Sequence, residues 1–191
     1  MSENERKQIP GDGEDVLSWT HGEINDAFEG VNVDPTFKAA LDFSNAATNW
    51  DQGLETFARS ITNSISQAWE GAAAEKAKDA IERYTDDARK LEPLLTRLSN
   101  QIAESASAIV DTKKAIPGYR RHSWTANVWP PRAAEEERAR NDAEAEAQNA
   151  MDTNYRARLG EHDAQIPVLP VGQDPTRPLD IPASKPGDNP N

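Results

Sequence analysis

The stretch that decides the fold is SQAWEGAAAEKAKDA, residues 66–80, in which Trp69, Glu70 and Gly71 stand between two long segments with helical periodicity. The chain holds five Trp and ten Gly in 191 residues. By composition alone, random placement would give about a quarter of a Trp-x-Gly tripeptide in such a chain. The tripeptide by itself is therefore weak evidence, and its setting decides what it means.

Before the tripeptide, apolar residues recur at steps of three and four, which is the pattern of one stripe on an α-helix. The stripe consists of Phe37, Leu41, Ala47, Trp50, Leu54, Phe57, Ile61, Ile65 and Ala68. Asp34 and Pro35 favour a helix start, with the carboxylate as N-cap and the proline at the first helical position. The pattern predicts a helix over residues 36–69, about 50 Å long.

After Gly71 the pattern restarts and comes close to a heptad repeat, which keeps one face of a helix turned toward a partner helix. Its members are Ala77, Ile81, Tyr84, Ala88, Leu91, Leu95, Leu98, Ile102, Ala106 and Ile109. Pro93 removes one backbone hydrogen bond inside this segment, so we expect a kink there. The run Ile116-Pro117-Gly118 ends the helix. Two long helices joined at Gly71 predict an antiparallel helical hairpin.

The segments on either side of the hairpin carry weaker patterns. Residues 15–30 predict a short helix that is interrupted near Gly22. Residues 130–159 predict a largely solvated helix that docks through a narrow row of alanines and is ended by Gly160. Residues 1–14 are polar, and residues 161–191 hold seven of the thirteen prolines. We expect an all-α, elongated helical bundle over residues 15–160, between a disordered N-terminus (1–14) and a disordered Pro-rich tail (161–191).

Composition excludes several classes of function. The formal net charge of -12 argues against binding to nucleic acid or to an anionic membrane surface. The N-terminal residues have no apolar core of a signal peptide, and no run approaches the roughly 18 apolar residues of a membrane span. We therefore expect no cleavable secretion signal and no membrane span, so export would need a route that reads neither.

Side chains that could carry chemistry are scattered. The chain has no Cys, and His21, His122 and His162 fall in three separate segments without a second ligand at helical spacing. Asp86 and Asp87 are neighbours on a helix and splay apart, whereas acid–base catalysis needs two carboxyl groups in one cleft. No Gly-rich phosphate loop is present. We therefore expect no metal site, no cofactor and no enzymatic activity.

Large apolar residues exceed what two helices bury. Phe43, Trp50, Phe57 and Trp69 cannot all lie in a two-helix interface, so part of this surface must meet the third helix or another chain. The loop from Tyr119 to Trp129, which also holds Trp124, has two interpretations. It is either an aromatic and basic partner surface or a small core that caps the end of the hairpin.

A Trp69-x-Gly71 turn between two long helices, followed by small residues, resembles the WXG family of type VII (ESX) secretion substrates. The length and the charged, proline-ended second helix are similar to the larger relatives, the PPE and EspB-type proteins of mycobacteria and related actinobacteria. The resemblance covers roughly residues 37–117. It implies export of a folded helical bundle without a Sec signal, often as a dimer, with Trp69 and Gly71 as part of the secretion signal and of the partner contact.

One part of the family's composite signal is missing. The resemblance implies a Tyr-x-x-x-Asp/Glu motif, but Tyr84, Tyr119 and Tyr155 are followed four residues later by Ala, Ser and Leu. Either a partner chain supplies this motif, as PE proteins do for PPE proteins, or the chain itself is not exported. The excess of apolar surface favours the first explanation. The alternative function is an intracellular helical scaffold or adaptor with a coincidental Trp-x-Gly, and its location would then be cytoplasmic.

Overall fold

The computed structural model describes residues 9, 13–118 and 130–170, and most of these residues are helical, with no β-strand among them. The elements, in chain order, are the 3-10 helix η1 (Val16–Ser18), α1 (His21–Glu29), α2 (Asp34–Ala68), α3 (Ala72–Arg89), α4 (Leu91–Ala115), α5 (Pro130–Ala150), the π-helix η3 (Met151–Arg156) and α6 (Ala157–Asp163). The all-α prediction is confirmed.

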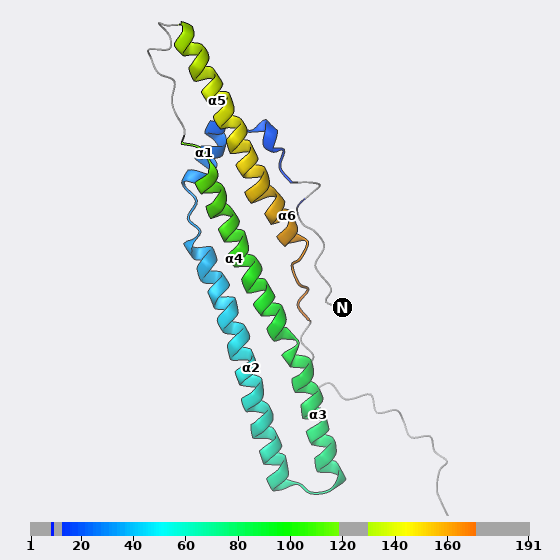
Figure 1. Cartoon of the computed structure of the whole chain (residues 1–191). Coiled ribbons are helices and arrows are strands. Elements are labelled where there is room, and N and C mark those ends of the chain that lie inside the picture. The colour runs from blue at the N-terminus through cyan, green and yellow to red at the C-terminus, as the bar shows by residue number, and fades with distance from the viewer. Residues whose placement is uncertain (1–8, 10–12, 119–129, 171–191) are drawn as a thin grey trace, which may run out of the picture.

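Helix α2 forms one side of a long hairpin, and α3 and α4 together form the other (Figure 1). α2 packs against α3 and α4. Its inward face repeats every seven residues, with Ala40, Ala47 and Leu54 buried. Seven residues are close to two helical turns, so these side chains lie in one row that faces the partner helix. The predicted antiparallel hairpin is therefore present.

The start of α2 differs from the prediction. Asp34 is the first residue of the helix and Pro35 the second, while the N-cap position is occupied by Val33 without a side-chain hydrogen bond. The backbone N–H of Asp34 instead donates to the side-chain oxygen of Asn32 at 2.9 Å. The acceptor thus comes from two residues earlier than predicted, and Asp34 is placed where its charge favours the helix dipole.

The predicted kink near Pro93 is confirmed. α3 ends at Arg89, one turn residue follows, and α4 begins at Leu91 with Pro93 as its third residue. The missing N–H of Pro93 would have paired with the carbonyl of Arg89, four residues earlier. Lys90 keeps right-handed helical backbone angles (φ -62°, ψ -15°). The chain therefore bends at this residue, but α4 continues onward from α3 and does not turn back.

The main hydrophobic core lies outside the hairpin turn, where the segments before and after the hairpin pack together. We call η1, α1, α5, η3 and α6 the cap. Its core consists of Val16, Ile24, Phe28, Ala147 and Met151, with Trp19, Ile109, Ile116 and Tyr155 packed against it. The rings of Phe28 and Tyr155 meet edge to face, with centroids 5.3 Å apart. The cap lies beside α4, on the part of that helix far from the Gly71 turn (Figure 1).

Two predictions about the cap were wrong in detail. The N-terminal segment is interrupted at Trp19 and Thr20 rather than at Gly22, because Thr20 and Glu23 form a reciprocal capping box that starts α1 before Gly22. The C-terminal helix does not end at Gly160 but continues to Asp163 through the π-helix. The predicted docking by alanines is present, since Ala147 and Ala150 are buried.

Candidate partner-binding surface

The hairpin turn is built from Trp69, Glu70 and Gly71. α2 ends at Ala68, and the backbone N–H of Trp69 still donates to the carbonyl of Ile65 at 2.9 Å. Gly71 has φ +84° and ψ -165°, and its carbonyl accepts from the N–H groups of Ala74 and Glu75 at the start of α3. The predicted position of the turn is therefore confirmed.

Gly71 is required by its backbone conformation. A φ of +84° with an extended ψ is a region that residues with a Cβ rarely adopt. A Cβ built on Gly71 would meet no atom within 4 Å, so the backbone angle and not a lack of space is what requires the glycine. The glycine allows the chain to reverse, and space around it stays open.

Trp69 projects from this turn. It is 57% exposed, and among the described residues its indole N–H has no hydrogen-bond partner. A tryptophan in this state offers a large apolar surface together with one free donor, which is the combination that protein interfaces favour. The turn between α2 and α3 lies at the end of the hairpin away from α1 and α5 (Figure 1), and Trp69 is exposed at this turn.

Trp50 and Phe57 lie along the junction of α2 with α3. The indole N–H of Trp50 donates to the carbonyl of Ala88 at 2.7 Å, and the ring of Phe57 meets that of Tyr84 at a centroid distance of 6.1 Å. Trp50 nevertheless stays 38% exposed and Phe57 40% exposed. Sequence reasoning missed the role of Tyr84 as a support for Phe57, although both residues lie in the predicted apolar stripes.

The third helix does not cover this surface. α5, η3 and α6 pack against α4 and α1, on the side of α4 away from α2 (Figure 1). The surplus apolar surface is predicted to meet either the third helix or another chain. For Trp50, Phe57 and Trp69, contact with the third helix is therefore excluded. Tyr119, Trp124 and Trp129, the other predicted surface residues, lie outside the described residues.

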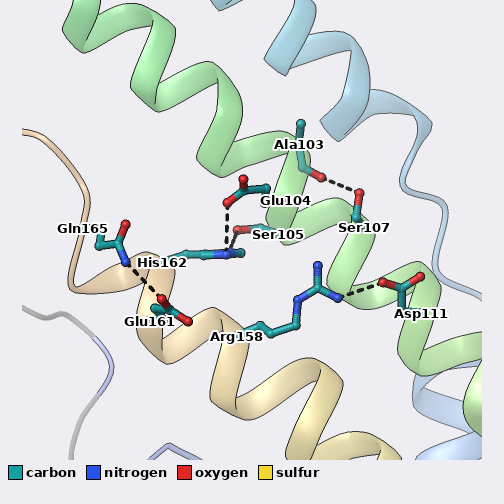
Figure 2. A network of polar contacts seen from close by, with 9 residues as sticks. All are labelled: Ala103, Glu104, Ser105, Ser107, Asp111, Arg158, Glu161, His162 and Gln165. Carbon is teal, nitrogen blue, oxygen red and sulfur yellow. Dashed lines mark hydrogen bonds and ion pairs between the residues drawn. The ribbon is translucent and has the colours of Figure 1, made fainter.

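A polar network joins α6 to α4 (Figure 2). His162 lies with Nδ1 3.1 Å from the hydroxyl of Ser105 and Nε2 3.3 Å from a carboxylate oxygen of Glu104. One helical turn away, the guanidinium of Arg158 pairs with the carboxylate of Asp111 at 2.8 Å. These contacts fix the direction in which the C-terminal end of the cap runs along α4.

The Ser105–His162–Glu104 contact has the composition of a catalytic triad but not its setting. Acyl transfer also needs backbone or side-chain donors aimed at the developing oxyanion. Ser105 lies in the middle of α4, where backbone N–H groups are used by the helix itself. The geometry therefore supports helix docking rather than nucleophilic catalysis.

The remaining polar candidates have structural partners. His21 is buried, with Nε2 2.8 Å from the carbonyl of Pro117. Asp86 pairs with Arg89 and Asp87 with Lys90, so the two carboxylates point to different partners. The hydrogen bond and charge of Asp87 raise the pKa of Lys90. His122 lies outside the described residues.

Within the ranges that the structure describes, no group of three or more His, Asp or Glu side chains is placed to hold a metal ion. In the same part of the chain, no helix combines the length and apolarity needed to cross a membrane.

Comparison with known proteins gives one match. Residues 31–113 match the model of the WXG100 family, described as proteins of 100 residues with WXG. The matched segment begins just before α2, contains the whole Gly71 turn and ends in the last turn of α4. It is therefore the hairpin that is similar to WXG100 proteins, whereas the helices of the cap lie outside the match. No curated protein and no solved structure matches the chain.

Proposed function

We propose that this chain is a non-enzymatic type VII (ESX) secretion substrate or secretion-associated protein that acts by packing its helical hairpin against a partner. The single observation that carries the proposal is the position of Trp69 and Gly71. They form the reversal of a long hairpin inside the segment that matches the WXG100 family. A Trp-x-Gly tripeptide in the middle of a helix would not support this function.

The two residues have different roles in this proposal. Gly71 supplies the positive φ that lets α3 run back along α2. Trp69 supplies the contact, because it is the most exposed aromatic side chain among the described residues and its indole donor is free there. A partner that buried this ring and accepted its hydrogen bond would gain both apolar burial and a polar contact that fixes its orientation.

The partner in this proposal supplies what the chain lacks. No tyrosine of the sequence is followed four residues later by an acidic residue. A helical partner that carries Tyr-x-x-x-Asp/Glu would complete the composite signal beside the Trp69 turn, in the manner of PE and PPE pairs. The cap leaves the turn end of the hairpin open for such a partner (Figure 1).

The test is export from a cell that has a type VII system. The chain is expressed there and in an otherwise identical strain without the secretion ATPase, and the culture medium and cell wall are compared with the cell lysate. We expect machinery-dependent export, with a cytosolic marker confirming that cells are intact. Retention in the lysate of both strains, with the candidate partner co-expressed, would favour the scaffold or adaptor function.

A further inference from the structure

A cavity of about 500 Å³ lies in the cap and is open to solvent. One wall is the N-terminal segment at η1, with Glu14, Asp15 and Leu17. The other wall comes from α5 and η3, with Gln148 and Asp152. The two walls are more than a hundred residues apart in the sequence, but they lie side by side in the structure (Figure 1). Ligand sites usually measure roughly 300–1,000 Å³, so this cavity is large enough to take a side chain or a small molecule.

The two walls are joined by contacts within the protein at three points. Val16 of η1 is buried in the core of the cap. The side-chain amide of Gln148 donates to the carbonyl of Trp19 at 2.8 Å. Gly13 has φ +85°, and a Cβ at this position would lie 3.3 Å from Cγ of Arg156, so the backbone passes close over the Arg156 side chain. The cavity therefore keeps its shape without a ligand.

The lining of the cavity carries more negative than positive charge. Three carboxylates, those of Glu14, Asp15 and Asp152, line it together with one guanidinium, that of Arg156. Arg156 pairs with one oxygen of Asp152, and one oxygen of Asp15 accepts from the backbone N–H of Leu17 at 3.2 Å. The carboxylate of Glu14 makes no hydrogen bond or ion pair with any residue that the structure describes. Each carboxylate thus keeps at least one oxygen for a ligand, and the lining suits a cation.

The carboxylates do not converge on one point, as a metal ion would require. A bound metal ion needs several oxygen ligands around one centre. Over the described part of the chain, no three acidic or histidine side chains are placed in that way. An organic cation is different, because its charged group and its aliphatic part contact different places. The cavity offers both kinds of contact, since Leu17 and Ala145 line it beside the carboxylates.

The exposure of Leu17 favours a ligand that is larger than a free amine. Leu17 is 79% exposed, more than any other large apolar side chain among the described residues. A small cation inside the cavity would leave most of this side chain in water. A polypeptide that enters with a basic residue can also cover Leu17 with a neighbouring aliphatic side chain, and this burial adds to the affinity.

We propose that this cavity binds an arginine or lysine side chain of a partner polypeptide, whose neighbouring aliphatic residue packs on Leu17. The charged group lies among the carboxylates of Glu14, Asp15 and Asp152, and the aliphatic stem of the basic residue packs along Ala145. The net charge of -12 attracts a basic partner from a distance. The elements that form the cavity lie outside the segment that matches the WXG100 family.

The proposal goes beyond export, because the cavity is far from the Gly71 turn and its ligand need not be the partner of the hairpin (Figure 1). It is tested by binding to the purified full chain, without secretion machinery and without a hairpin partner. Failure to bind a basic peptide and failure to be exported are therefore separate outcomes, measured in separate experiments.

The first test is the titration of the isotope-labelled full chain with a short blocked peptide that holds one arginine beside one leucine. We expect chemical-shift changes at the backbone amides of Leu17, Gln148 and Asn149, which line the cavity. The matched control peptide carries citrulline, which has nearly the shape of arginine but no charge. We expect it to bind at least about tenfold more weakly. Arginine amide alone should also bind at least about tenfold more weakly, because it leaves Leu17 uncovered.

The second test compares two charge reversals. Glu14→Lys places a positive charge in the lining, and we expect it to weaken binding of the arginine peptide by about tenfold. Glu146→Lys is the matched control, because it changes the net charge equally at an exposed residue of α5 that does not line the cavity. We expect its effect to stay below about twofold. Unchanged helical circular dichroism confirms that both variants fold.

Four results would overturn the proposal. The first is the absence of shift changes in the lining at millimolar arginine peptide. The second is equal affinity for the arginine and citrulline peptides, which would show that charge is not recognised. The third is equal weakening by Glu14→Lys and Glu146→Lys, which would show only a general attraction to an acidic protein. The fourth is arginine amide that binds as tightly as the peptide, which would make the cavity a small-molecule site.

Discussion

The indole N–H of Trp50 on α2 donates a hydrogen bond to the carbonyl of Ala88 on α3, at 2.7 Å. The bond joins residues 38 apart in sequence and lies where the hairpin has no third helix beside it. It also turns the polar edge of the ring inward, so an apolar face is left outside. One contact thus stabilises the hairpin and shapes the apolar surface that the ring leaves exposed.

Replacing Trp50 by phenylalanine should therefore weaken the hairpin. Trp50→Phe keeps an aromatic ring but removes the donor, and we expect a loss of about 1 kcal/mol in the free energy of unfolding. Urea unfolding at low protein concentration, where association contributes least, measures it. Trp69→Phe removes an indole donor that has no partner among the described residues, so its stability should match the wild type. Equal losses in both variants would show that the Trp50–Ala88 bond contributes nothing.

The two glycines of the hairpin should respond to alanine in opposite directions. Gly71→Ala forces a Cβ into a backbone region with φ +84°, and we expect a loss of about 1–3 kcal/mol. Gly53→Ala lies inside α2 with open space around it, and we expect a gain of about 1 kcal/mol in monomer stability. Thermal unfolding followed by circular dichroism measures both. If Gly71→Ala were neutral, the turn would not need its positive φ.

Gln101 of α4 should be replaceable by an apolar residue at no cost. Its side chain is buried, and within the described ranges neither amide atom has a hydrogen-bond partner. A buried polar group without a partner costs about 1–3 kcal/mol. We expect Gln101→Met, which has a similar shape, to raise the free energy of unfolding by about 1 kcal/mol. The exposed control, Gln67→Met, should change little. A clear loss in the Gln101 variant would reveal a partner for the amide.

Tyr155 should make the fold less stable at alkaline pH. Burial, with a smaller contribution from the charge of Glu14, raises the pKa of its phenol in the folded protein. The folded state thus holds this proton to higher pH than the unfolded chain does. Its contribution is complete below the unfolded pKa of about 10 and is lost as the pH rises through the raised folded pKa. We expect Tyr155→Phe to show a shallower loss of stability above about pH 10 than Tyr84→Phe, which keeps Tyr155.

The sequence was sufficient for the hairpin because its signals are local and long. The apolar stripe of α2 extends over more than thirty residues, and the same face that carries Ala40, Ala47 and Leu54 is the one that is buried. Gly71 was recognised as the turn because it separates two such stripes, and Pro93 as a bend because its effect on the backbone does not depend on distant residues.

The cap could not be predicted in the same way. Ile24 and Phe28 are buried against Ala147 and Met151, which lie more than a hundred residues later in the sequence. Neither segment has an apolar stripe that is pronounced enough to predict this contact. For the same reason the sequence alone predicts a helix end at Gly160. The backbone at Gly160 stays helical because the residues that follow it are held by distant segments. His162 contacts α4, and the carboxylate of Asp163 accepts a hydrogen bond from the backbone N–H of Ile9.

The candidate surface was predicted in part. The sequence predicts that two helices cannot fully bury Phe43, Trp50, Phe57 and Trp69, and the last three of these are exposed in the structure. The sequence does not reveal that Trp50 and Phe57 are held from within by Ala88 and Tyr84, because that depends on how α3 is rotated against α2.

Export of Trp69→Ala tests the central claim most directly. The variant and its matched control, Gln67→Ala, are expressed in a strain with an active type VII system, and the fraction of each in culture medium and cell wall is measured. We predict that Trp69→Ala stays in the cell, although its helical content and unfolding match the wild type, while Gln67→Ala is exported as the wild type is. Export of Trp69→Ala at the wild-type level would contradict the role of the Trp69 turn in secretion.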